Sequence, residues 1–198
     1  MPHLTRGDLW SLEKYSEQRD SFRTEVLAHK RNRQLSLGEN ARIYFEDTLT
    51  IRYQIQEMLR IEKVFDVAGI EEELAAYNPL IPDGTNLKAT FMIEFGDPEV
   101  RAQRLREMRG IENCINLEIE GHGIVQVIAD EDLERETEEK TSAVHFMRFE
   151  LNSGQIAALK GGAPLFASVE HAAYPVARFE VSQVTRDALT KDLSLVAH

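Results

Sequence analysis

The chain has 198 residues, and its 34 acidic side chains outnumber 23 basic ones, which gives a formal net charge of -11. A chain of this length suits one domain, which buries roughly 70% of the surface that its unfolded form exposes. The acidic balance argues against a general nucleic-acid-binding role, because binding to phosphates depends on a basic face. From the length of the chain we expect a single domain over 1–198. The patterns described below divide it into a helical half at 1–80 and a sheet-rich half at 81–198.

The cysteine content limits the chemistry further. Cys114 is the single cysteine, which excludes an internal disulfide and a multi-cysteine metal or iron–sulfur site supplied by this chain alone. The first residues show no signal-peptide pattern, and no stretch approaches the ~18 apolar residues that a membrane span needs. We expect a cytoplasmic protein that does not cross a membrane.

The first part of the chain has helical periodicity. Apolar residues at three- and four-residue steps predict a long amphipathic helix over about 8–33, and a weak alternation predicts a strand at 41–45. A second helix with an apolar stripe is expected at about 48–65, and Gly69 separates it from a short acidic helix at 70–77. The first helix offers more apolar surface than one contact needs, which favours a homodimer. The side chains concerned are Leu9, Trp10, Leu12, Tyr15 and Phe22.

A loop at 77–88 follows these helices and combines two prolines, a glycine and turn-forming polar residues. Proline fixes φ, glycine permits positive φ, and asparagine and aspartate can bond their own backbone, so we expect one conformation. Such a loop presents its polar side chains together. It supplies candidate substrate-binding residues, which are Asn78, Asp83, Thr85, Asn86 and Lys88.

The remainder of the chain has mainly β patterns. Strands are expected at 87–95, 114–119, 124–128, 142–151, 165–170 and 176–181, and helices at 98–109, 153–160 and 183–192. The strands at 114–119 and 124–128 are expected to form a hairpin across a tight turn. Antiparallel strands that follow a helical segment favour an α+β fold, with N-terminal helices packed on a mainly antiparallel β-sheet.

The second expected helix has a polar face, on which Tyr53, Glu57 and Arg60 lie at helical steps with Arg52 beside them. A carboxylate next to an arginine and a phenol can orient an anion or move a proton, but a solvated helix face with an ion pair needs the same residues. We take Glu57 as a candidate general base and the other three as candidate substrate-binding residues. His145 is a candidate acid or ligand, although its alternation with apolar residues also fits a satisfied core histidine.

No metal-ligand spacing, nucleotide-binding loop or nucleophile motif of high specificity occurs in the sequence, so we assign no cofactor and no metal site. Metal binding by His122, His145 or His171 is left open. The run 130–140 contains seven acids. It indicates either a surface for a cation or a basic partner, or simply a solvated helix or linker.

Stretches 45–58, 77–90, 128–132 and 140–146 are similar to a bacterial family of about this length that is catalogued as a domain of unknown function. The similarity covers nearly the whole chain, and the stretch around the 77–88 loop is its most specific part. The resemblance implies no particular reaction and no catalytic residues. It implies an association with a rubrerythrin-like protein and an iron–sulfur oxidoreductase-like protein, and so a role near peroxide defence or electron transfer.

Two functions are compatible with these features. The first is an accessory or binding protein that docks on such a redox partner through the acidic residues 134–139 and the loop 83–88. The second is an enzyme or metal-dependent protein that acts on a small anionic substrate. The enzyme hypothesis requires that the structure bring the candidate residues of three segments into one pocket. These residues are Glu57, Asp83, Lys88 and His145.

Overall fold

The computed structural model describes residues 3–133, 135, 137 and 139–194. Three acids of the 134–139 run, Glu134, Glu136 and Glu138, lie outside the described residues. None of the helices in the described ranges is both long enough and apolar enough to cross a membrane.

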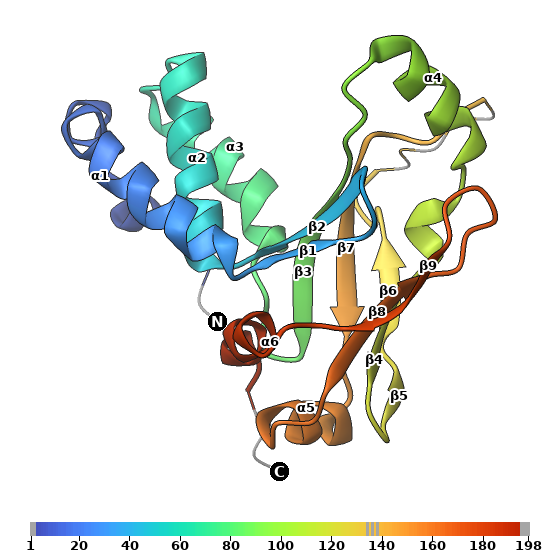
Figure 1. The fold of residues 1–198 in the computed structure, drawn as a ribbon. Coiled ribbons are helices and arrows are strands. Elements are labelled where there is room, and N and C mark those ends of the chain that lie inside the picture. Colours follow the sequence, from blue (N-terminus) through green and yellow to red (C-terminus); the bar gives the residue numbers. More distant parts are fainter. Residues whose placement is uncertain (1–2, 134, 136, 138, 195–198) are drawn as a thin grey trace.

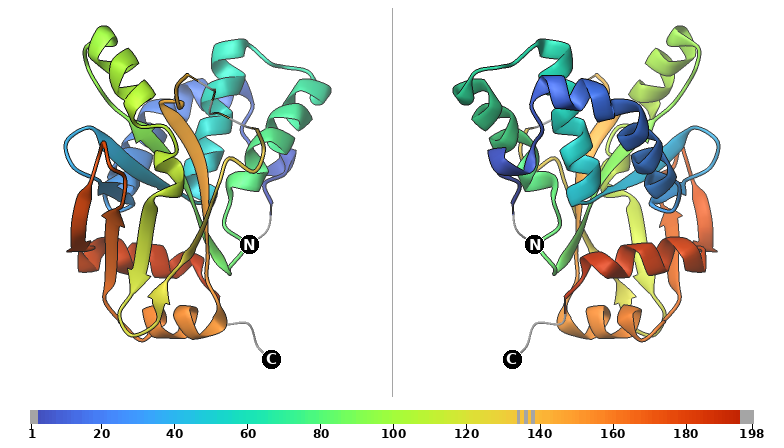
Figure 2. Two further views of the ribbon diagram at one scale, coloured as in Figure 1. Left: turned by 90° about the vertical axis from the view of Figure 1, so that its right-hand side faces the viewer. Right: turned by 90° about the vertical axis from the view of Figure 1, so that its left-hand side faces the viewer.

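The helices lie in three regions of the molecule. The elements α1, α2 and α3 form one group beside the sheets, while α4 lies at one end of the molecule and α5 and α6 near the other (Figure 1). Figure 2 shows the same arrangement from two further sides. The bounds of the helices are Leu12–Arg31 for α1, Thr48–Glu62 for α2, Val67–Tyr77 for α3, Pro98–Glu107 for α4, Ser153–Lys160 for α5 and Gln183–Leu189 for α6.

The strands form two antiparallel sheets. Sheet A has the order β1-β2-β3-β7-β6, with bounds Gln34–Ser36, Ala41–Glu46, Asn86–Ile93, Val144–Glu150 and Gln126–Ala129. Sheet B has the order β5-β4-β8-β9, with bounds Gly123–Ile124, Ile115–Ile119, Leu165–Val169 and Val176–Glu180. The α+β class is confirmed, with helices packed beside antiparallel strands. The strands are divided between two sheets, and β1 and β2 from the helical half of the sequence belong to sheet A.

The expected hairpin strand at 124–128 is divided between the two sheets. Its first part, β5, pairs with β4 in sheet B, whereas β6 pairs with β7 in sheet A. Val125 lies between them, is buried, and donates its N–H to the main-chain oxygen of Leu117 over 2.8 Å. The chain therefore crosses from one sheet to the other at a buried apolar residue, which a strand pattern alone does not reveal.

Two helix boundaries also differ from the expectation. The second helix ends before Lys63, whose φ of 55° is left-handed, and does not continue to 65. The third helix begins at Val67 because the Asp66 side chain accepts a hydrogen bond from the Gly69 N–H. Gly69 therefore lies in the first turn of α3 and does not separate the two helices.

The main core fills the space between the two sheets, and α4, α5 and α6 contribute to it. Smaller cores join α1, α2 and α3 to one another. Tyr15 and Phe22 of α1, which suggested a homodimer, are buried within the chain against Trp10 and Tyr53. The homodimer stays a prediction, but Tyr15 and Phe22 are buried and cannot contribute apolar surface to a dimer interface.

Candidate functional site

Sheet A has an outer face that is turned away from the main core. Side chains alternate along each strand, so one set from β3 and β7 is buried while the other set is half-exposed. The helices α2 and α3 flank this outer face and leave a groove with two hollows of about 600 and 340 Å³. Tyr77, Leu80 and Phe146 line both hollows, which therefore adjoin one another.

Lys88 and Arg148 line the larger hollow, and they are direct cross-strand neighbours on β3 and β7. The Arg148 guanidinium donates hydrogen bonds to both carboxylate oxygens of Glu131, at 2.8 and 2.6 Å, and it also pairs with Glu150. Within the described residues, the Lys88 ammonium makes no hydrogen bond and no ion pair. Burial and the adjacent Arg148 charge lower the pKa of Lys88. Lys88 is thus a half-buried amine that faces an open hollow.

Glu46 lines the smaller hollow and is 9% exposed. Its carboxylate accepts hydrogen bonds from the hydroxyls of Thr50 at 2.6 Å and Thr90 at 2.8 Å. Among the residues that the structure describes, no cation forms an ion pair with this carboxylate. The nearby Arg33 donates to the main-chain oxygen of Glu46 and pairs through its side chain with Asp192. Glu46 is therefore hydrogen-bonded but not neutralised.

The polar face of α2 does not line this groove. Glu57 accepts hydrogen bonds from the Arg19 guanidinium at 2.7 and 2.9 Å and from the Tyr15 hydroxyl at 2.5 Å, so it faces α1. Arg60 also donates to Glu57, over 3.2 Å. These donors, Arg19 first, lower the pKa of Glu57 to about 2. A carboxylate held this firmly in its charged form is a poor general base near neutral pH.

The two neighbouring candidates on α2 also contact α1 and the segment before it. The Arg52 guanidinium lies over the Trp10 ring, 4.5 Å from its centroid. The Tyr53 ring packs edge-on against Phe22, with a centroid separation of 5.8 Å. Both side chains therefore join α2 to the N-terminal part of the chain, where they stabilise helix packing.

Polar side chains of the 77–88 loop are directed at the loop itself and at β7. The Asp83 carboxylate accepts hydrogen bonds from the N–H and the hydroxyl of Thr85, both at 2.8 Å, and from the Asn86 amide at 2.9 Å. The Asn86 amide also donates to Glu150 over 3.3 Å, and the Thr85 hydroxyl, whose single hydrogen is shared between the two acids, lies 2.9 Å from Glu150. This set ties the loop to the end of the sheet.

Asn78 bonds the N-terminal segment and does not contact the other loop candidates. Its amide donates to the main-chain oxygen of Leu4 and accepts from the Leu4 N–H, at 2.9 and 2.8 Å. Of the five candidates in the loop region, Lys88 is therefore the one that lines the groove.

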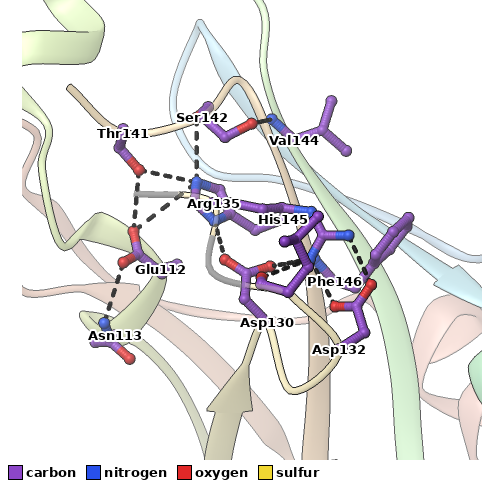
Figure 3. A network of polar contacts seen from close by, with 11 residues as sticks. Glu112, Asn113, Asp130, Asp132, Arg135, Thr141, Ser142, Val144, His145 and Phe146 are labelled. Carbon is purple, nitrogen blue, oxygen red and sulfur yellow. Dashed lines mark hydrogen bonds and ion pairs between the residues drawn. The ribbon is translucent and has the colours of Figure 1, made fainter. Parts of the chain in front are cut away.

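His145 lies on the opposite, inner face of β7 and is fully buried (Figure 3). Its Nδ1 is 2.5 Å from an Asp130 carboxylate oxygen, and its Nε2 is 3.0 Å from the Thr141 hydroxyl. Asp130 has a left-handed φ of 52°, and its carboxylate accepts hydrogen bonds from the Phe146 N–H and from Arg135. His145 therefore belongs to a network that holds the turn after β6, and it is a satisfied core histidine.

The candidate residues of the enzyme hypothesis do not converge. Glu57 faces α1, Asp83 bonds its own loop, His145 is buried on the inner face of β7, and Lys88 lines the groove. No group of three or more histidine, cysteine, aspartate or glutamate side chains suited to a metal occurs in the described ranges. His171, one of the histidines left open, contacts the main-chain oxygen of Arg109 through its Nε2 at 2.8 Å.

Several groove residues were not predicted as site residues. Phe146 and Arg148 share the outer face of β7, and the alternation of that strand was a usable signal for placing them together. Glu46 had no comparable signal, and Glu131 was indicated only as part of the acidic run 130–140. They reach the groove because β2 and the turn after β6 are brought to the same face of sheet A by tertiary pairing.

A family model covers nearly the whole chain. Residues 3–193 match the family model described as "Protein of unknown function (DUF3501)", and the chain belongs to this family. A crystal structure of a novel protein of unknown function from Burkholderia pseudomallei K96243 is similar to this chain, with 48% sequence identity and a TM-score of 0.93. The similarity covers 98% of this chain and 100% of that one. No curated protein matches the chain.

Proposed function

We propose that this protein is a binding protein that holds a small carboxylate-bearing ligand in the groove over sheet A. The observation that carries the proposal is Lys88, whose half-buried ammonium lines the larger hollow and makes no hydrogen bond or ion pair with a described residue. Partial burial of a charge that no hydrogen bond or ion pair satisfies costs free energy. A ligand carboxylate would offset that cost with a charge-assisted hydrogen bond.

The middle of the groove favours a ligand with an apolar body. Tyr77, Leu80 and Phe146 lie where the two hollows adjoin, next to the charged groups. Binding sites for small molecules are commonly about 300–1,000 Å³ and combine an apolar lining with a few polar groups. Both hollows lie in that range of volume. The ligand that fits this lining is an aryl- or alkyl-substituted carboxylate.

Binding is favoured over catalysis because the groove lacks the acid–base pair that the enzyme hypothesis requires. Glu57 and His145 are both engaged elsewhere, in the contact between α1 and α2 and in the inner network of β7. Their hydrogen-bond partners give each of them a sufficient structural role. The groove therefore supports recognition of an anion without supplying the proposed proton transfer.

The family resemblance adds a proposed cellular context. We propose that the protein acts in the cytoplasm with an iron–sulfur or rubrerythrin-like redox partner, in peroxide defence or electron transfer. Glu131 and Asp132, at the start of the acidic run, line the larger hollow, so a partner on that run would lie beside the bound ligand. Affinity purification from the native cell should recover such a redox protein in stoichiometric amount. Recovery of the protein without it would contradict this context.

The binding proposal is tested by mapping where a probe anion binds. Amide resonances of the ¹⁵N-labelled protein are followed while 3-phenylpropanoate is added. We expect shifts around Lys88, Tyr77 and Phe146, and we expect Lys88→Gln to require about 10- to 100-fold more ligand to produce them. Lys191→Gln removes an exposed lysine on another surface and should leave them intact. Shifts confined to other surfaces, or none, would overturn the proposal.

A further inference from the structure

We infer that the ligand is a zwitterion of the amino-acid type, whose carboxylate binds Lys88 and whose ammonium binds Glu46. This inference rests on the proposed function and narrows its ligand class. It adds the carboxylate of Glu46 to the Lys88 ammonium, which carries the binding proposal.

The register of sheet A places the two groups together. Glu46 and Lys88 are directly opposed residues of β2 and β3, and both side chains are on the groove face. Directly opposed residues of antiparallel strands have Cα atoms about 4.5–5.5 Å apart. An α-amino acid carries its ammonium and carboxylate on one carbon atom, so one head group can reach both side chains.

The two charges do not neutralise each other. Opposite charges at directly opposed positions commonly form a stabilising cross-strand pair. In the described part of the chain, Glu46 and Lys88 form no ion pair with each other or with any other residue. Each lines its own hollow, with Phe146 shared between the hollows. The arrangement leaves one acceptor site and one donor site open to the groove.

The Glu46 carboxylate is prepared to accept an ammonium. Each of its oxygens already accepts one hydroxyl hydrogen bond, from Thr50 or from Thr90, which fixes the orientation of the carboxylate. A carboxylate has about four acceptor positions, so further hydrogen bonds remain available. An ammonium has three donors and carries the charge that Glu46 lacks nearby.

The other cations near Glu46 do not take this role. Lys30 lines the same hollow, but its ammonium forms no ion pair with any described residue. Arg33 is buried, and its guanidinium is engaged by Asp192, Asp47 and main-chain oxygens. The carboxylate of Glu46 therefore faces the hollow without a cation in contact.

The apolar lining indicates the side chain of the ligand. Tyr77, Leu80 and Phe146 surround the point where the two hollows adjoin, so a head group held by Glu46 and Lys88 lies beside them. Aromatic rings pack favourably against such residues. A large apolar or aromatic amino acid fits this lining better than a small polar one.

Three matched probes separate the two charges of the ligand. Phenylalanine carries both charges, 3-phenylpropanoate lacks the ammonium, and phenethylamine lacks the carboxylate. Calorimetric titration of the full-length protein should show phenylalanine binding at least about 10-fold more tightly than either analogue. Glu46→Gln, which keeps the shape of the side chain, should remove that advantage over 3-phenylpropanoate, whereas Lys191→Gln, on another surface, should leave the advantage intact.

The outcomes distinguish the two proposals. If 3-phenylpropanoate binds at the groove as tightly as phenylalanine, the zwitterion inference is overturned and the binding proposal stands. If phenethylamine alone binds, the binding proposal itself is overturned. Absence of binding by all three probes to the folded wild-type protein contradicts both. A cooperative thermal unfolding transition of Glu46→Gln, measured beside that of the wild-type protein, is the control that the variant is folded in these titrations.

Discussion

Lys88 of β3 lies directly opposite Arg148 of β7, and of these two cations Arg148 is the one that forms ion pairs with acids of the described residues. The charges of Glu131, Asp83 and Glu150 act on Lys88 without a hydrogen bond or an ion pair. Glu131 and Glu150 both bond the Arg148 guanidinium, while within the described residues the Lys88 ammonium has no hydrogen-bond or ion-pair partner. Like charges directly opposite on neighbouring strands are destabilising. The sheet therefore holds a second cation that no hydrogen bond or ion pair of the described residues ties to the fold, and this separates it from Arg148.

Replacing Lys88 should not destabilise the protein. Lys88→Gln removes a half-buried charge that is repelled by Arg148, so we expect the free energy of unfolding to stay the same or to rise by up to about 1 kcal/mol. Urea unfolding at pH 7 measures the change, with Lys191→Gln as the control for loss of an exposed lysine. A loss of more than about 1 kcal/mol would show that Lys88 supports the fold.

Binding of a carboxylate should weaken at high pH, and at a lower pH than an ordinary lysine would allow. The pKa of Lys88 is lowered from 10.5, first by burial and then by Arg148. The cation that binds the anion is therefore lost as pH rises through this lowered pKa. In the same interval the unfolded chain binds more protons than the folded one, so the Lys88 contribution to stability rises with pH. Titrations of 3-phenylpropanoate between pH 7 and 11 measure the effect, and constant affinity up to pH 10.5 would contradict it.

Glu57 should stabilise the packing of α1 on α2. Its folded pKa of about 2 lies below the ordinary value of 4.5, chiefly because of the Arg19 hydrogen bonds. A lowered carboxylate pKa adds stability that is present above about pH 4.5 and is lost as pH falls toward about 2. We expect Glu57→Gln to lose about 2 kcal/mol at pH 7.

The pH dependence and a second variant check this assignment. The difference between wild type and Glu57→Gln should shrink in unfolding experiments as pH falls below 4.5 toward 2. Arg19→Gln should give a similar loss at pH 7, and the double variant should lose less than the sum of the two. Additive losses would mean that Glu57 and Arg19 act independently.

The 77–88 loop should depend on Gly84 for its shape. Gly84 has a φ of +107°, and an added Cβ would lie 3.2 Å from the Ser194 side chain. We expect Gly84→Ala to lose about 1–3 kcal/mol of stability. Gly121 has a φ of +73° with nothing within 4 Å of the added atom, so Gly121→Ala is the matched control, with a smaller loss of about 1 kcal/mol. Equal losses would exclude the Ser194 contact as a cause.

The sequence predicted the local features of this fold better than the pairing of its strands. Alternation in the strand at 142–151 is enough to place His145 on one face and Phe146 and Arg148 on the other, as they lie in the structure, because side-chain direction follows from strand geometry alone. The assignment of β5 and β6 to different sheets was not predictable, because it depends on which distant strands are nearest in space. The same holds for the candidate site, because its local groups of residues were predictable and its contacts between distant segments were not.

Candidate residues chosen from a helix pattern failed to identify the groove. The polar face of α2 was correctly grouped, but its partner is α1, because Tyr15 and Arg19 reach Glu57 across the helix contact. Lys88 was identified through its loop, although its role depends on Arg148 from a distant strand. A single sequence identifies candidate residues for such a groove, but the register of distant strands, which it does not give, decides which charged side chains lie together.

The central claim, that Lys88 binds a ligand carboxylate, is tested most directly by calorimetric titration of 3-phenylpropanoate into wild type, Lys88→Gln and Lys88→Arg at pH 7. A hydrogen bond to a charged group is worth about 1.5–3 kcal/mol, so we expect Lys88→Gln to bind about 10- to 100-fold more weakly. Lys88→Arg keeps the charge and should stay within a few-fold of wild type. The same Kd for wild type and Lys88→Gln would contradict the claim.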